Sequence, residues 1–191
     1  VINRLKRFGI SQPRLYKKVG AKEIRNKLEA GRKFFVKVHY GSMGKGITYL
    51  SRDNWQTNFI CKDNRIVSKR SDHGWRFRNT TGSNAFLRQL IKKDVIIQER
   101  IDPMTVDGHI VDLRIYTFMG KAIYIYPRIN SIDKVTTNIS QGGKGDPKLI
   151  KHIPKYLVNK AIKEAEEASR VLNVGLAGID IIPDKNFREV F

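Results

Sequence analysis

Asp180 is the residue whose position most directly suggests chemistry, because it stands in a strongly apolar segment between Ile179 and Ile181. A buried carboxylate is costly unless it is paired with a cation or bound to a metal ion. Strand alternation places Asp180 on the face opposite to its two isoleucine neighbours, so a solvent-facing carboxylate is the alternative. Its position alone does not decide between the two.

A second group of charges could line an anion-binding pocket. Asp112 and Arg114 are two residues apart and therefore share one face of a predicted strand, and Arg128 follows the next strand. A carboxylate with two guanidinium groups on neighbouring strands can hold an anion in a fixed orientation. A cross-strand surface pair is the alternative.

The glycine-rich segment 41–46 follows one predicted strand and precedes another. A P-loop or a dinucleotide motif needs a helix at this point, and neither is present. A glycine-rich hairpin can still lay backbone N–H groups over phosphates, and Lys37, four residues upstream, would direct its ammonium group to the same place. An ordinary hairpin turn is the alternative.

Other catalytic patterns are missing from the sequence. The four histidines and Cys61 do not have zinc-ligand spacing, and no Ser/His/Asp or Cys/His signature is found. The alternating run Trp75-Arg76-Phe77-Arg78 could stack on nucleic-acid bases, but a plain edge strand is the preferred interpretation.

Composition limits the classes of protein further. The 191 residues include 37 Lys and Arg against 18 Asp and Glu, which gives a net charge of +19 and predicts an anionic partner without identifying it. Nucleic acid is compatible with this charge, but no motif indicates it. A hydrophobic content of 40% argues against disorder, and no apolar run is long enough to span a membrane. A single cysteine fits a reducing compartment, so we expect a cytoplasmic protein.

The elements that must position these residues follow from hydrophobic periodicity, which predicts an α+β chain of mainly antiparallel hairpins in two lobes, 1–97 and 98–191. Helices are expected over 1–10, 21–30, 84–92 and 154–173. Strands are expected over 14–16, 34–38, 47–50, 59–60, 65–67, 95–99, 111–118, 122–127 and 178–182, with a return strand from 187 onward. Segments 68–81 and 136–147 are expected to be loops.

The order of these motifs is more informative than any one of them. Lys37 and the glycine hairpin come first, followed by the Gln98–Ile101 segment, the charges on the next two strands, the Asn138–Gly143 segment, a long helix and Asp180. This order resembles the ATP-grasp superfamily, and within it the ligases that add glutamate to a ribosomal protein and the YheC/YheD endospore-coat-associated proteins. The resemblance implies two lobes of mainly antiparallel sheet with packed helices and a nucleotide between them.

The resemblance also implies a role for each matching residue. Nucleotide-binding roles, for phosphates, lid, adenine hinge and ribose side, fall on Lys37, Ser42, Met43, Gly44, Gln98, Glu99, Arg100, Ile101 and Asp112. Asp107 competes with Asp112 for the last of these roles. Positions near the transferred phosphoryl group, here called catalytic, fall on Arg114, Arg128 and Asn138. Asp180 matches the first magnesium carboxylate.

The sequence departs from the family pattern at its end. The family places Glu-x-Asn on the strand after Asp180, whereas here Glu189 is followed two residues later by Phe191. Either the true motif lies beyond Phe191 or the metal site is degenerate, and we expect the former. The domain that precedes this fold in the family would likewise lie before Val1.

The implied function is an ATP- and Mg²⁺-dependent ligase. It would activate a carboxylate substrate as an acyl phosphate for attack by an amine acceptor, either of which could be polyanionic. The alternatives are a different ATP-grasp chemistry, such as a kinase, and a basic non-catalytic module that binds a coat polymer, nucleic acid or another polyanion and keeps a vestigial ATP site.

Overall fold

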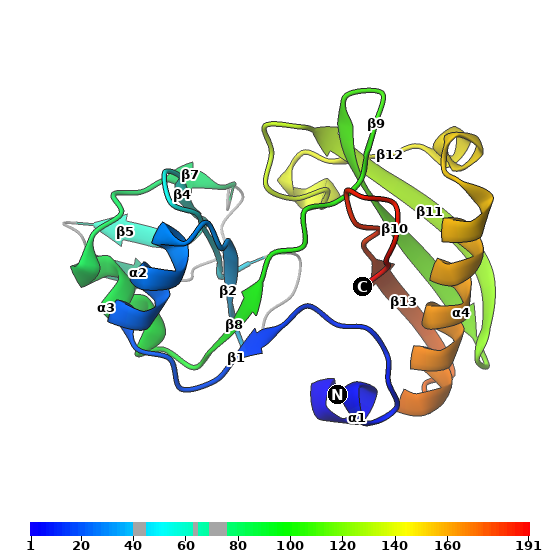
Figure 1. Ribbon diagram of the computed structural model, residues 1–191, viewed down its shortest axis with the longest axis horizontal. Helices are drawn as coiled ribbons and strands as arrows, with labels where there is room; N and C mark the ends of the chain where they lie inside the picture. The colour runs from blue at the N-terminus through cyan, green and yellow to red at the C-terminus, as the bar shows by residue number, and fades with distance from the viewer. Residues whose placement is uncertain (40–44, 63–64, 69–75) are drawn as a thin grey trace. The chain divides into compact units, whose positions relative to one another are not determined.

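The computed structural model describes residues 1–39, 45–62, 65–68 and 76–191 (Figure 1). It divides the chain into two compact units, which we describe separately. The N-unit is Pro13–Arg100, and the C-unit combines Val1–Gln12 with Ile101–Phe191.

The expected lobes, 1–97 and 98–191, have one boundary, whereas the structure divides the chain at two points. The first helix, α1 (Ile2–Arg7), contacts α4 (Lys155–Leu172) and belongs to the C-unit. Strand β8 (Val95–Glu99) pairs along its whole length with strands of the N-unit, so the boundary falls after Arg100.

The N-unit is built on a six-stranded antiparallel sheet with the order β1-β8-β2-β3-β4-β7. Besides β8, its strands are β1 (Leu15–Tyr16), β2 (Phe34–Val38), β3 (Ile47–Leu50), β4 (Trp55–Thr57) and β7 (Arg78–Asn79). Its other elements are the helices α2 (Ala21–Glu29) and α3 (Asn84–Ile91) and the separate hairpin of β5 (Ile60–Lys62) and β6 (Arg65–Ser68).

Alternation along β2 explains how this sheet forms a core and leaves a second face. Phe34 and Val36 are fully buried and pack with Ile24 of α2 and Leu87 of α3. Lys37, which alternates with them, therefore lies on the face away from these helices.

The strand β4 is absent from the sequence prediction, and β7 lies inside a predicted loop. Both are too short for two-residue periodicity to be seen, and they are held by pairing with β3 and with each other. The predicted edge strand around residue 77 corresponds in part to β7, which is the last strand of the sheet; Trp75 lies outside the described residues.

The C-unit sheet has the order β12-β11-β10-β13, with β9 also paired to β10. Its strands are β9 (Thr105–Val106), β10 (His109–Phe118), β11 (Lys121–Ser131), β12 (Lys144–Gly145) and β13 (Leu176–Ile181). Two 3₁₀ helices, η1 (Ile139–Gln141) and η2 (Pro147–His152), lie between β11 and α4. Helix α4 covers one face of the sheet (Figure 1), and its Leu157 and Ala161 pack on Leu113 and Ile115 of β10.

Strand β11 continues past Pro127, where the sequence predicted its end. The carbonyl of Pro127 accepts a hydrogen bond from the backbone N–H of Asp146, which lies on the side away from β10. The N–H that a proline lacks would point to that same side, so its absence removes no hydrogen bond between β10 and β11. Arg128 consequently lies within β11 and not after it.

After β13 the chain makes a short return instead of the expected strand from Phe187. The backbone of Ile182 exchanges two hydrogen bonds with Phe191, and Pro183 forms an isolated bridge with Val190. Across the described parts of the chain, no helix has the length and apolar character needed to cross a membrane.

Candidate functional site

Four charged residues meet on the face of the C-unit sheet that α4 leaves open. The register of the strands pairs Asp112 of β10 with Arg128 of β11, and Arg114 of β10 with Asp180 of β13. Because residues opposite each other in a sheet share a face, all four side chains lie on one side. Their apolar neighbours, such as Leu113, point to α4 on the other side.

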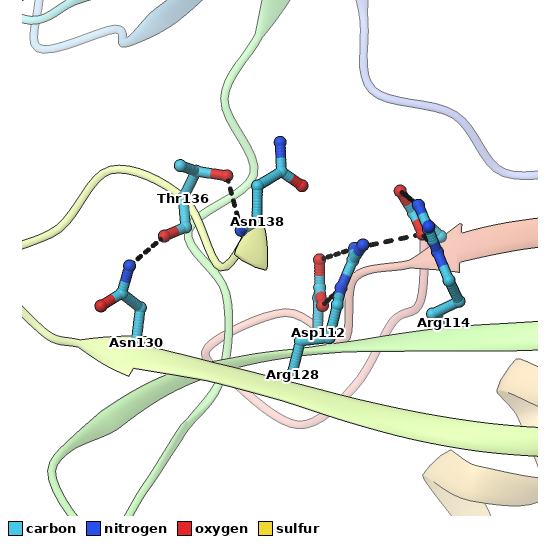
Figure 2. A network of polar contacts seen from close by, with 7 residues as sticks. Asp112, Arg114, Arg128, Asn130, Thr136 and Asn138 are labelled. Atoms are coloured by element: carbon cyan, nitrogen blue, oxygen red, sulfur yellow. Dashed lines mark hydrogen bonds and ion pairs between the residues drawn. The ribbon is translucent and has the colours of Figure 1, made fainter. Parts of the chain in front are cut away.

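These residues, which we call the four-residue ion cluster, form one continuous network (Figure 2). Arg128 donates from Nε and Nη2 to the two carboxylate oxygens of Asp112, at 2.7 and 2.5 Å. Arg114 binds Asp180 in the same bidentate way, at 2.8 and 2.9 Å. The Nη2 atom of Arg128 also lies 3.1 Å from Oδ1 of Asp180 and so joins the two pairs.

The two pairs differ in burial. The side chains of Asp112 and Arg128 are 10% and 4% exposed, whereas those of Asp180 and Arg114 are 42% and 35% exposed. A ligand can therefore reach Arg114 and Asp180, while Asp112 and Arg128 support them from below.

Burial and hydrogen bonding have opposite effects on the pKa values of the cluster. Burial raises the pKa of Asp112, and the hydrogen bonds from Arg128 and Thr137 oppose that rise. Burial alone would lower the pKa of Arg128, but its bond to Asp112 outweighs this and holds the pKa above the usual value. The bond to Asp180 likewise raises the pKa of Arg114. Both guanidinium groups therefore stay charged, and the cluster combines two cations with two carboxylates.

The loop after β11 adds Thr137 and Asn138 to this site. Thr137 is buried and helps to lower the pKa of Asp112, and the backbone N–H of Asn138 donates to Oγ1 of Thr136 (Figure 2). Two glycines shape the loop. Gly142 has φ +95°, and a Cβ on Gly143 would lie 1.9 Å from the carbonyl oxygen of Thr137.

A row of tyrosines continues the same face beyond Arg114. Tyr116, Tyr124 and Tyr126 have ring centroids 6.2 and 6.1 Å apart in succession, and Tyr116 adds to the raised pKa of Arg114. Sequence reasoning grouped Tyr116 with Arg114 but gave it no role. The signal for the row is the same two-residue spacing that placed Asp112 and Arg114 on one face of a strand.

In the N-unit, Lys37 lies on the sheet face away from α2 and α3. Its Nζ donates to Oε1 of Gln98 at 2.7 Å. Phe35 and Tyr49 lie on the same face with their rings 5.6 Å apart, and the guanidinium of Arg100 lies over Tyr49. We call this set the Lys37 face; sequence reasoning had not identified its aromatic members.

Glu99 does not belong to the Lys37 face. Its carboxylate accepts hydrogen bonds from Arg32 at 2.7 Å and from the hydroxyl of Tyr16 at 3.0 Å, on the helix side of the sheet. Any contact of Glu99 with a ligand on the Lys37 face would be through its backbone. Ile101, the last residue of the expected hinge, is the first residue of the second segment of the C-unit.

Three expected lid residues, Ser42, Met43 and Gly44, lie outside the described residues. The base of their hairpin is described: the backbone N–H of Val38 donates to the carbonyl of Gly46 at 3.0 Å.

Two carboxylates that the sequence left as alternatives lie elsewhere in the C-unit. Asp107 lies in the turn between β9 and β10, 3.4 Å from His152. Glu189 forms an ion pair with Lys160 of α4 at 2.8 Å, whereas Asp180 lies on the face away from α4. Neither Asp107 nor Glu189 therefore belongs to the four-residue ion cluster, whose carboxylates are those of Asp112 and Asp180.

Comparison with known proteins gives this arrangement a family. The family described as YheC/D-like ATP-grasp matches residues 4–186, nearly the whole chain. The chain belongs to this family. Its α+β fold of two mainly antiparallel units is accordingly an ATP-grasp fold, as the order of motifs predicted. A search of curated protein sequences found no significant match.

Solved structures of ATP-grasp ligases share this fold. The ligase PsnB, in complex with a minimal precursor, Mg and ADP, aligns with a TM-score of 0.54 at 13% identity over 100% of this chain and 47% of its own. D-alanine–D-alanine ligase from Bacillus anthracis aligns at 0.56, with 13% identity over 100% of this chain and 53% of its own. A RiPP-associated ATP-grasp ligase from Chryseobacterium gregarium, in complex with ADP and a leader and core peptide, aligns with a TM-score of 0.51. The identity is 13%, over 100% of this chain and 48% of that ligase. The chain therefore spans about half the length of these ligases.

The ATP-grasp family implies magnesium, and the donor set can be tested against it. Within the described segments, no group of three or more His, Cys, Asp or Glu side chains could by itself hold a metal ion. Mg²⁺ often takes only one or two carboxylates and completes its shell with phosphate oxygens and water. Asp180, partly exposed on the open face, can supply one such carboxylate. Its oxygens would then bind Mg²⁺ as well as Arg114 and Arg128.

Proposed function

We propose that this chain is the ATP-grasp portion of an ATP-dependent ligase. The observation that carries the proposal is the four-residue ion cluster, in which an accessible guanidinium and an accessible carboxylate are held on the open face of the sheet. Phosphoryl transfer needs charged groups that are positioned in advance, because the phosphates are highly charged. It needs no nucleophile from the protein, so positioning and charge supply most of the catalysis.

The reaction proceeds in two displacements. An oxygen of a carboxylate substrate attacks the γ-phosphorus of ATP, the bond to the β-phosphate oxygen breaks, and ADP leaves with an acyl phosphate formed. The nitrogen of an amine acceptor then attacks the acyl carbon, phosphate leaves, and the amine loses a proton to solvent as the amide forms. No covalent intermediate with the protein is needed.

The candidate site residues of the two units each have a part in this scheme. Lys37 binds nucleotide phosphates, and Gln98 and the following backbone bind adenine. Arg114 contacts the transferred phosphoryl group, because its side chain is 35% exposed and a ligand on the open face can reach it. Arg128 is too buried for direct contact and acts as a positioning residue, anchored by Asp112 and holding Asp180. Asn138 contributes its amide from the same loop, whose Thr137 helps to lower the pKa of Asp112.

Magnesium, held by Asp180 and the phosphates, would neutralise part of the phosphate charge. Whether a second carboxylate completes the site is tested by two substitutions. We expect Asp180→Asn to abolish magnesium-dependent ADP release, and Glu189→Gln, which loses only the pair with Lys160, to leave it nearly unchanged. Loss of turnover in both variants would mean that Glu189 takes part in the site.

ATP binding is tested separately from turnover. Lys37→Met should weaken ATP binding measured by calorimetry by about 1.5–3 kcal/mol, the usual value of a hydrogen bond to a charged group. Lys22→Met, on the exposed side of α2, serves as the control for loss of one positive charge in the same unit. Equal ATP affinity in wild type and Lys37→Met would contradict the phosphate role of Lys37.

The substrates are best sought with a panel of acids and amines in a phosphate-release assay. One of the similar ligases is in complex with a minimal precursor and another with a leader and core peptide, so peptides belong in that panel. A second candidate function, a non-catalytic polyanion-binding module in the cytoplasm, is favoured by the net charge of +19. ATP affinity without turnover for any acid and amine would favour this module over the ligase.

A further inference from the structure

The segment that runs from η2 into α4 carries an unusual run of cations. Residues 147–163 contain five lysines and no acidic residue. One of them, Lys160, is paired with Glu189. The other four are exposed, and we call them the lysine strip: Lys148, Lys151, Lys155 and Lys163.

Local geometry places the strip on the outer surface of the C-unit. In a 3₁₀ helix, side chains three residues apart eclipse one another, so Lys148 and Lys151 share one side of η2. Lys155, Asn159 and Lys163 follow at intervals of four on α4, opposite the buried line that begins with Leu157. Because α4 lies against the sheet with that buried line, the strip faces away from the four-residue ion cluster.

The strip has no neutralising partner in the parts of the chain that the structure describes. No ion pair joins Lys148, Lys151, Lys155 or Lys163 to a carboxylate there. The second half of the same helix is different, because Glu166 accepts a hydrogen bond from the backbone of Ala122 and lies 3.5 Å from Arg170.

The charges of α4 also run against its own dipole. The first nine residues of the helix include three lysines and no acid, and the last nine include three glutamates. The positive end of a helix favours acidic residues, so this order gives up stability that the reverse order would supply. It also adds the positive end of the helix to the lysine charges, which strengthens the attraction for an anion in front of them.

From these observations we infer that the lysine strip is a binding surface for the phosphate backbone of nucleic acid. Two turns of α4 separate Lys155 from Lys163, about 12 Å, and one nucleic-acid strand has a phosphate about every 3.4 Å along the axis, so the strip spans several phosphates. Lysines bind phosphates as point charges and do not select a base sequence. A membrane surface fits less well, because the apolar face of α4 is buried in the core and cannot enter lipid.

The inference is tested by binding of the full chain, without nucleotide, to a fluorescent duplex of about 20 base pairs at several salt concentrations. Four phosphate contacts predict a slope of about −3.6 for log K against log salt concentration. The variant Lys151→Gln/Lys155→Gln/Lys163→Gln should lose most of that slope and at least tenfold in affinity at 0.1 M salt. Circular dichroism checks that the variant is folded.

The control variant, Lys22→Gln/Lys92→Gln/Lys93→Gln, also loses three positive charges. Its three lysines are exposed and lack an ion pair among the described residues. We expect its affinity to change less than threefold. An equal loss in both variants would show that the net charge acts diffusely and would overturn the inference, as would a strip variant that binds like wild type. Equal competition by polyglutamate of matched charge would overturn it in favour of an acidic protein partner.

Discussion

Asp112 and Arg128 show how a buried ion pair can support a neighbouring exposed one. A lone charge in this position would be strongly unfavourable, but two parallel hydrogen bonds join the carboxylate to the guanidinium. Arg128 has a further N–H group left for Asp180, so the buried pair fixes the place of the residue that a ligand can reach. We expect the buried pair to matter for stability and the exposed pair to matter for ligands.

Removal of one member of the buried pair tests this division. Arg128→Gln should destabilise the C-unit by about 3–5 kcal/mol, because it leaves Asp112 buried without a counterion. Arg114→Gln, in the half-exposed pair, should cost no more than about 1 kcal/mol. Hydrogen exchange at the amides of β10 and β11 measures both, because it reports the local stability of this sheet. A smaller loss in Arg128→Gln than in Arg114→Gln would contradict the assignment.

Residue types and spacing revealed much of this site. Two-residue spacing on predicted strands correctly placed Asp112 and Arg114 on one face, and it left open whether Asp180 was buried or faced outward. The pairing partners could not be predicted. They depend on the register between strands that are far apart in the sequence, and Arg128 entered that register only because β11 continues past Pro127.

At the scale of elements, the loop from β11 to β12 owes its shape to two adjacent glycines with different roles. Gly142 supplies a left-handed backbone conformation with open space around it, whereas Gly143 lets its own backbone approach that of Thr137. Asparagine can replace Gly142 at a moderate cost, since asparagine also adopts positive φ. No residue with a Cβ fits at position 143, because the atoms that it would meet belong to the backbone.

Substitution of each glycine separates the two roles. Gly143→Ala should lower stability by about 1–3 kcal/mol, as overpacking usually does, and should weaken the contact of Thr137 with Asp112. Gly142→Asn should cost clearly less. Calorimetric melting of the two variants provides the comparison, and a larger effect of Gly142→Asn would mean that the close approach at Gly143 relaxes easily.

The return after β13 is organised by one carboxylate. Asp184 accepts hydrogen bonds from the backbone N–H groups of Arg188 and Glu189, both at 2.8 Å, and from that of Asn186 at 3.3 Å. Burial alone would raise the pKa of Asp184, but these N–H groups outweigh it and hold the pKa below the ordinary value of 3.8.

The direction of this shift predicts a pH dependence. Since the folded-state pKa is depressed, the charge of Asp184 stabilises the fold above pH about 4 and stops doing so as the pH falls through the folded-state value. Asp184→Asn should therefore cost about 1–2 kcal/mol at pH 7 and progressively less below pH 4. Urea denaturation followed by circular dichroism at several pH values measures the difference. A cost that stays constant down to pH 2 would mean that the charge contributes nothing.

At the scale of the whole molecule, each unit has its own core. Phe34, Leu50 and Leu87 are fully buried in the N-unit, and Leu113, Ile115 and Leu157 are fully buried in the C-unit. The alternation and helix signals predicted apolar faces in both units, but they placed the first twelve residues in the first lobe, whereas the structure groups them with the C-unit. That assignment depends on a contact between α1 and α4, which local sequence cannot reveal.

Residues 13–100 should consequently fold by themselves. All six strands of the main sheet and both helices of the N-unit lie within this range, and Trp55 is 4% exposed in its core. We expect the isolated fragment to show a cooperative urea transition with the blue-shifted tryptophan emission of a buried indole. Emission like that of free tryptophan before any urea is added would contradict this expectation.

The discontinuity of the C-unit has a consequence for synthesis on the ribosome. Helix α1 ends at Arg7, but its partner α4 begins only at Lys155, 155 − 7 = 148 residues later. At about 5–20 residues per second, the newly made helix waits about 7–30 s for its partner, while the whole N-unit can emerge and fold in between. Its apolar side stays uncovered during that time. A chaperone that binds nascent chains would thus find a target in α1 until α4 has been made.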